Sequence, residues 1–148
     1  MQLKKAAIKK AMPFVLDNSV VTAWYFENQA TNYSDGVLKL ISQDVAHVPS
    51  LWPLEFSNVL RKSVSSKRIT EARAREIIAQ NSRWTIMVDA SAPDPGDILS
   101  LSLAYGLSSY DAAYLDLAIR LRLSVATKDE ALQQAAKAAG IGIVEVAV

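Results

Sequence analysis

The 148-residue sequence contains no cysteine and a single histidine, His47. The lack of cysteine excludes disulfide bonds and thiolate metal sites, and it is typical of a protein kept in a reducing compartment. A Ser-His-Asp mechanism would depend wholly on His47, and the sequence has no G-x-S-x-G nucleophile elbow. We therefore expect a cytoplasmic protein whose chemistry uses neither a thiol nor a histidine.

The sequence also lacks long apolar runs and a strong excess of either charge. No stretch approaches the ~20 apolar residues of a membrane-spanning helix, so we expect no association with a membrane. Sixteen basic and fifteen acidic residues give a formal net charge of +1. The net charge of the whole chain therefore does not indicate that it binds nucleic acid. The first twelve residues carry four lysines but lack the apolar region of a signal peptide. We expect residues 1–12 to be a basic extension and residues 13–148 to form a single domain.

The sequence is, by contrast, rich in short apolar runs that alternate with helical patterns, and 51% of its residues are hydrophobic. The apolar runs predict strands at residues 13–17, 45–48, 84–88 and 123–126, and an edge strand at 141–146. The helical patterns lie at residues 20–26, 32–42, from 49 into the 60s, 71–81, 98–105, 108–122 and 130–139. Strands that alternate with helices predict an α/β fold, a three-layer α/β/α sandwich with a mostly parallel central sheet.

Four acidic residues have notable positions in this pattern. Asp17 ends the first strand and Asp129 follows the fourth, whereas Asp111 opens a helix and Glu55 lies early in the long helix. Each acid also has a purely structural explanation. Helix dipoles favour an acidic side chain at the positions of Asp111 and Asp129. Asp17 fits a turn, and Glu55 fits a helix position that faces solvent. In an open α/β sheet, however, ligands bind beyond the carboxyl ends of the strands. The pattern therefore predicts that these acids share one cleft.

Clustered carboxylates repel one another and need a cation, and ligands that are all oxygen favour Mg²⁺ or Mn²⁺. Such an ion activates a bound water and stabilises the transition state of phosphoryl transfer. Polar neighbours would orient the carboxylates, namely Asn18, Ser19, Asn58 and Thr127. Helix capping is the alternative role for the hydroxyl residues, and Asn18 and Ser19 are also placed to cap the first helix. Thr127 with Glu130 predicts a capping box.

Four segments of the sequence resemble the PIN-domain family: VLDNS at 15–19, PSLWPLEFSN at 49–58, YDAAY at 110–114 and ATKDEAL at 126–132. The resemblance runs from residue 13 to the C-terminus and is greatest to the toxin ribonucleases of bacterial VapBC toxin–antitoxin pairs. It implies a metal-dependent endoribonuclease that uses Mg²⁺ or Mn²⁺, with Asp17, Glu55, Asp111 and Asp129 as catalytic ligands. It also implies a homodimer and a cognate antitoxin that occludes the site.

Other features are less specific. Asp116 is acidic where the family usually has an apolar or small residue, and we interpret it as a surface acid, with an auxiliary ligand as the alternative. A basic stretch supplies candidate RNA contacts, although a solvated helix end explains it equally well: Arg61, Lys62, Lys67 and Arg68. The apolar helices at 20–26 and 37–41 are expected to leave exposed patches for a homodimer.

Three other classes of protein also place acids on an α/β sheet. A signalling receiver module usually has paired acids after its first strand, but Asp17 is followed by Asn18 and Ser19. A phosphatase of the haloacid-dehalogenase type usually has a second aspartate where this sequence has Ser19. A catalytically silent, protein-binding PIN-like domain is the third alternative, and a metal-dependent RNA cleavage assay separates the nuclease from all three.

Overall fold

The structure is a computed structural model that describes residues 12–147. The prediction of a basic extension at residues 1–12 therefore lies outside the described residues, apart from Met12. No helix within the described part of the chain is long and apolar enough to cross a membrane.

A parallel sheet of four strands forms the middle layer. The strands are β1 (Phe14–Leu16), β2 (Ala46–Val48), β3 (Ile86–Val88) and β4 (Val125–Ala126), in the order β3-β2-β1-β4. Val15 on β1 lies opposite His47 on one side and Val125 on the other. All three residues of β1 are buried, because a parallel sheet is covered on both faces.

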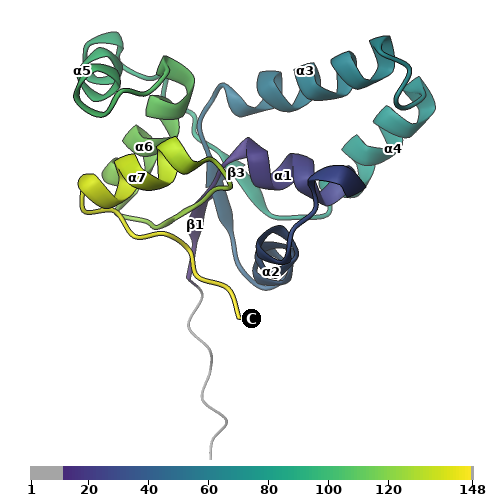
Figure 1. The fold of residues 1–148 in the computed structure, drawn as a ribbon, viewed down its shortest axis with the longest axis horizontal. Coiled ribbons are helices and arrows are strands. Elements are labelled where there is room, and N and C mark those ends of the chain that lie inside the picture. The colour runs from purple at the N-terminus through teal and green to yellow at the C-terminus, as the bar shows by residue number, and fades with distance from the viewer. Residues whose placement is uncertain (1–11, 148) are drawn as a thin grey trace, which may run out of the picture.

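Helices cover both faces of this sheet, which confirms the predicted three-layer α/β/α sandwich. Figure 1 shows α1 to α4 on one side of the sheet and α5 to α7 on the other. The chain moves outward from β1 to β3 and then returns past β1 to β4, so right-handed crossovers place the later helices on the opposite face. The described helices are α1 (Asn18–Tyr25), η1 (Glu27–Gln29), α2 (Asn32–Ile41), α3 (Trp52–Ser65), α4 (Glu71–Asn81), α5 (Pro95–Tyr105), α6 (Ser109–Leu121) and α7 (Glu130–Ala138).

The strand order reverses between β1 and β4. β1 is followed in sequence by strands on one side of it, whereas β4 pairs with its other side. In open α/β sheets such a reversal opens a crevice at the carboxyl ends of the two strands. The residues that follow β1 and β4 therefore face the place where a ligand is expected.

Helix α6 is the most deeply buried helix in the described part of the fold. Its residues from Ala112 to Ala118 are all buried, and it contacts β1, β4, α5 and α7. Asp116, which we expected at the surface, is 9% exposed and accepts a hydrogen bond from Arg120 Nε at 2.9 Å. The prediction was wrong because a helix packed on several sides has little surface to offer. Arg120 Nη2 also donates to Asp89 at 2.7 Å, so Asp116 belongs to a structural ion-pair network.

The apolar faces of α1 and α2 are buried and not exposed, contrary to the sequence prediction. Val20, Val21 and Val37 are fully covered, and Ile41 is 3% exposed. These helices pack against each other, and α1 also packs against α3, so their apolar residues belong to the main core. Large exposed apolar residues lie instead on other elements, among them Leu54, Met87, Leu99 and Leu103.

The C-terminal segment forms less sheet than predicted. Within the predicted edge strand at 141–146, only Ile143 makes a bridge, to Val125 of β4. The segment then packs along α2, where Tyr33 donates its hydroxyl to the Val144 carbonyl at 2.9 Å. A Cβ on Gly36 would lie 2.6 Å from Val146 Cβ, so the missing side chain on α2 makes room for this packing.

Candidate active site

The carboxyl ends of β1 and β4 bring Asp17 and Thr127 into contact. Asp17 follows β1 and is 5% exposed. Its Oδ2 accepts hydrogen bonds from Ser19 Oγ at 2.6 Å and from Thr127 Oγ1 at 2.8 Å. Burial raises the pKa of Asp17, and the two hydroxyl donors oppose that rise. The buried carboxylate is therefore held in one orientation by hydroxyl groups.

The same hydroxyls fix the loop that follows β4. Thr127 Oγ1 accepts from the backbone N–H of Asp129 at 3.0 Å, and Ser19 Oγ accepts from that of Lys128 at 3.0 Å. The predicted capping box of Thr127 and Glu130 is wrong, because Asp129 occupies the N-cap of α7 and accepts from Leu132 N at 2.9 Å. Asp129 commits one carboxylate oxygen to this cap, and its other oxygen makes no hydrogen bond within residues 12–147.

Asn18 lies beside Asp17 and has a buried polar atom that finds no partner among residues 12–147. Helix α1 begins at Asn18 with Asp17 in the cap position, so Asn18 and Ser19 do not cap this helix. Asn18 is 9% exposed, and its Oδ1 has no hydrogen-bond donor among the described residues. A buried amide oxygen without a donor is costly, and it is suited to a ligand or an ordered water.

Glu55 is held by a residue to which the sequence pattern assigned no role. Tyr114 on α6 is fully buried, and its hydroxyl donates to Glu55 Oε1 at 2.6 Å. Burial raises the pKa of Glu55, the Tyr114 hydrogen bond opposes the rise, and the charges of Asp17 and Asp111 add to it. Burial and the nearby carboxylates raise the pKa of Tyr114 as well, so its hydroxyl keeps its proton. The available signal was the segment YDAAY, which places Tyr114 three residues after Asp111, on the next turn of the helix.

Asp111 lies in the first turn of α6. Its backbone N–H donates to Ser108 Oγ at 3.1 Å, so Ser108 is the N-cap of this helix. The Asp111 side chain is half-buried, and burial raises its pKa first, followed by the charges of Asp17 and Asp129. The macrodipole of α6 favours a negative charge at this position, whereas desolvation and the neighbouring carboxylates disfavour it.

The four carboxylates share one electrostatic environment. The charge of Asp17 raises the pKa of Glu55 and Asp111, and the charge of Asp129 raises the pKa of Asp17 and Asp111. No lysine or arginine within residues 12–147 forms an ion pair with any of the four. The site therefore concentrates negative charge that the side chains of the described chain do not neutralise.

The sequence matches the PIN domain family over residues 14–138. The chain belongs to the PIN-domain family. A search of curated proteins found no match. Among solved structures, the chain is similar to the crystal structure of PAE2754 from Pyrobaculum aerophilum, with 21% identity and a TM-score of 0.68 over 90% of this chain and 88% of that one. This likeness shows the fold, and the family is generally one of metal-dependent nucleases. The family assignment leaves the receiver-like and phosphatase alternatives without support.

The donor set of this PIN domain suits a hard divalent cation. Within the described residues, no three acidic or histidine side chains lie close enough together to enclose a metal ion. Mg²⁺, however, usually keeps several waters and is bound through only one or two carboxylates. The available groups are all oxygen, and the unpaired Oδ1 of Asn18 lies next to Asp17 in the sequence. The residues therefore fit a hydrated Mg²⁺ or Mn²⁺.

Asn58 does not orient a carboxylate as predicted. It is exposed on α3, and its Oδ1 accepts from Arg61 Nε at 3.1 Å and from Arg61 Nη2 at 3.0 Å. Asn58 and Glu55 line a hollow of about 570 Å³ together with Leu54 and Tyr110, so the exposed side of Glu55 opens to solvent. The candidate RNA contacts Arg61, Lys62, Lys67 and Arg68 are all exposed, two of them on α3 and two in the turn that follows.

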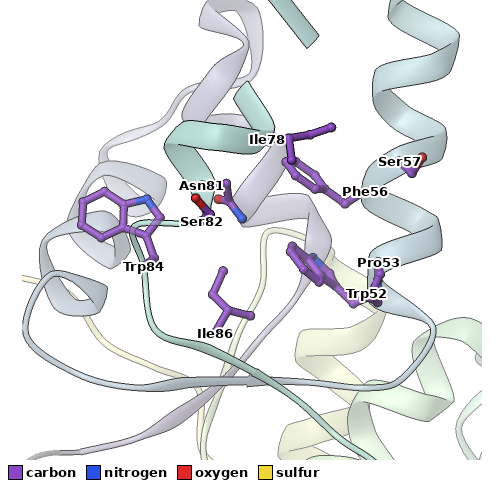
Figure 2. A pocket seen from close by; sticks show the side chains of 9 residues that line it. All are labelled: Trp52, Pro53, Phe56, Ser57, Ile78, Asn81, Ser82, Trp84 and Ile86. Carbon is purple, nitrogen blue, oxygen red and sulfur yellow. The ribbon is translucent and has the colours of Figure 1, made fainter. Parts of the chain in front are cut away.

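An apolar groove of about 380 Å³ lies between α3, α4 and β3. Figure 2 shows Trp52 and Phe56 of α3 on one side of it, with Trp84 and Ile86 across the cavity, and Ile78 of α4 lines it as well. The rings of Trp52 and Phe56 are stacked, with their centroids 5.2 Å apart. Exposed apolar grooves of this kind often mark a site of protein interaction.

Proposed function

We propose that this PIN domain is an endoribonuclease that hydrolyses RNA phosphodiester bonds with Mg²⁺ or Mn²⁺. The supporting observation is that four carboxylates act on one another electrostatically beyond β1 and β4, and that no lysine or arginine among residues 12–147 pairs with them. When bound, the divalent cation would supply an activated water and stabilise the negative charge of an in-line phosphoryl transition state. Asp17, Glu55, Asp111 and Asp129 are its candidate ligands, of which one or two would bind the ion directly and the others through its bound waters.

The surrounding residues have distinct tasks in this proposal. Ser19 and Thr127 hold Asp17 in a fixed orientation through hydrogen bonds from both hydroxyls. Tyr114 fixes Glu55, and because its hydroxyl stays protonated it acts only as a donor. Asp111 is half-buried, which leaves its carboxylate accessible from solvent at the start of α6.

The cleavage proposal is tested with purified protein and RNA in Mg²⁺, Mn²⁺ or EDTA. RNA cleavage should appear with either metal and disappear in EDTA, and Asp111→Asn should abolish it. Asp97→Asn is a matched control, because Asp97 lies three residues after the N-cap of α5 as Asp111 does in α6, but is exposed. Cleavage that persists in EDTA would refute the metal mechanism, and metal binding without any cleavage would indicate the catalytically silent alternative.

We further propose that the protein is the toxin of a type II toxin–antitoxin pair, a cytoplasmic homodimer inhibited by a cognate antitoxin. The motif resemblance supports the toxin role. The groove of Trp52 and Phe56 supports a protein partner, and Leu99 and Leu103, at 59% and 76% exposed on α5, support self-association. Light scattering should give a dimer at micromolar concentration, and the product of the neighbouring reading frame should bind and inhibit cleavage. A monomer that binds no such product would contradict this proposal.

A further inference from the structure

A basic stretch without acidic residues begins directly after Glu55. Between Glu55 and Glu71 the sequence contains four basic residues and no aspartate or glutamate. Arg61, Lys62, Lys67 and Arg68 are all exposed, and none of them forms an ion pair within the described part of the chain. We call these four residues the α3 basic stretch.

The geometry of α3 extends this stretch away from the carboxylates. Glu55, Asn58 and Lys62 are three and four residues apart and so share one face of the helix. At a rise of ~1.5 Å per residue, the end of α3 at Ser65 lies roughly 15 Å from Glu55 along the helix axis. In Figure 1, α3 leads from the strand ends to its turn into α4 at the edge of the molecule.

One hollow lies near the start of α3, where none of the four cations lines it, and a second lies at the α3–α4 turn. The first, of about 570 Å³, is the one that Glu55 and Asn58 line. The second, of about 550 Å³, is lined at the turn by Lys67, Arg68, Thr70 and Arg73 with two apolar residues. Lys67 has a φ of 61°, and its N–H donates to the Val64 carbonyl at 3.0 Å, so a closed turn presents these cations.

We propose that the α3 basic stretch binds the backbone phosphates of a single-stranded RNA that runs from the carboxylates to the α3–α4 turn. The inference rests on the proposed function, because it supplies the path of that RNA. Arginine, lysine, asparagine, serine and threonine side chains are the usual contacts to phosphate, and all five types occur here, with Ser65, Ser66 and Thr70 exposed beside the cations. Because RNA is negatively charged, its approach to four carboxylates requires positive side chains nearby to offset the repulsion. Phosphate contacts carry no sequence information, so the stretch would position RNA without selecting its bases.

The test is the salt dependence of RNA binding by the full chain. Metal-free Asp111→Asn protein is titrated into a fluorescent single-stranded RNA of about 4–16 nucleotides. Binding is measured by fluorescence anisotropy at salt concentrations between about 50 and 200 mM. Two variants remove the cations in pairs, Arg61→Gln with Lys62→Gln and Lys67→Gln with Arg68→Gln. A control pair removes Lys39 and Lys137, which are exposed in the last turns of α2 and α7. These two helices lie away from α3 in Figure 1.

Each α3 pair should reduce the slope of log affinity against log salt by about 1.4, since one phosphate contact to a single strand contributes about 0.7. The same slope implies a loss of affinity on the order of tenfold at 0.1 M salt, equal for RNAs of different sequence. The control pair should change the slope by less than half as much. Melting curves confirm that each variant is folded.

An unchanged slope in both α3 pairs would overturn the inference. So would a loss confined to an acidic peptide such as polyglutamate, because the stretch would then be a surface for protein. The assay needs neither metal nor catalysis, so the two proposals fail separately. Wild-type cleavage with unchanged slopes refutes only the RNA path, whereas reduced slopes without wild-type cleavage refute only the nuclease.

Discussion

The hydroxyl of Tyr114 donates to Glu55 at 2.6 Å from within a helix that is buried on several sides. The segment YDAAY predicted Asp111 from its position at a helix start, but it gave no role to Tyr114. A pattern within one helix cannot reveal which side chain of another helix it meets. That contact depends on how α3 and α6 approach each other across the end of the sheet.

Removing this hydroxyl is the first prediction. Tyr114→Phe should reduce metal affinity and RNA cleavage by about 10–100-fold, because outer groups that orient metal ligands have effects of this size. The free energy of unfolding should change by only about 0.5–1.5 kcal/mol, as expected for one hydrogen bond. Steady-state cleavage at several Mn²⁺ concentrations measures the effect, with Tyr105→Phe on α5 as the control. Equal activity of Tyr114→Phe and Tyr105→Phe would show that Tyr114 is only a packing residue.

Thr127 and Asp116 show that the type of a residue does not determine its role in the structure. Thr127 was assigned both to the site and to a capping box, and its hydroxyl in fact bonds Asp17 and the backbone of Asp129. The box failed because Asp129, two residues later, is itself a good N-cap. Asp116 has the same charge as the site acids, but Arg120 lies four residues on and pairs with it. An acidic residue that is paired with a nearby arginine is structural, whereas the site acids have no such partner within residues 12–147.

At the scale of elements, periodicity predicted most helices and strands, and their packing was harder to predict. The strands at residues 13–17 and 45–48 and the helix at 71–81 were placed close to their observed bounds. The apolar faces of α1 and α2 were expected to be exposed, because a sequence does not show which helices cover one another. The segment at 141–146 has a strand-like composition, yet beyond Ile143 it packs along α2, where Gly36 leaves room.

At the scale of the whole molecule, the strand order makes the site. Asp17 and Asp129 are far apart in sequence, and the charge of Asp129 acts on Asp17 because β4 pairs with β1 and not with β3. Alternating strands and helices predicted a parallel sheet and a shared edge for the acids. They did not give the strand order, and therefore did not show that the site lies at its reversal.

The raised pKa values of Asp17, Glu55 and Asp111 make the stability of the metal-free protein depend on pH. A folded-state pKa above the unfolded value, which is about 4 for these groups, contributes stability below pH 4 that is lost as the pH rises through the folded pKa. Assembling the charged site thus destabilises the metal-free fold at neutral pH. A cation that binds only the folded state reverses this effect.

Four melting curves test this central claim directly: wild type and Asp111→Asn, each with EDTA and with Mn²⁺ at neutral pH. In EDTA, Asp111→Asn should melt at the same temperature as wild type or higher, because it removes one of the repelling charges. Mn²⁺ at 100 times its Kd should stabilise wild type by about 2.7 kcal/mol, or roughly 5–10 °C, and should stabilise the variant much less. A marked drop in the melting temperature of Asp111→Asn in EDTA, with equal responses to Mn²⁺, would contradict the account. Asp111 would then be a structural residue of α6 and not part of a cation site.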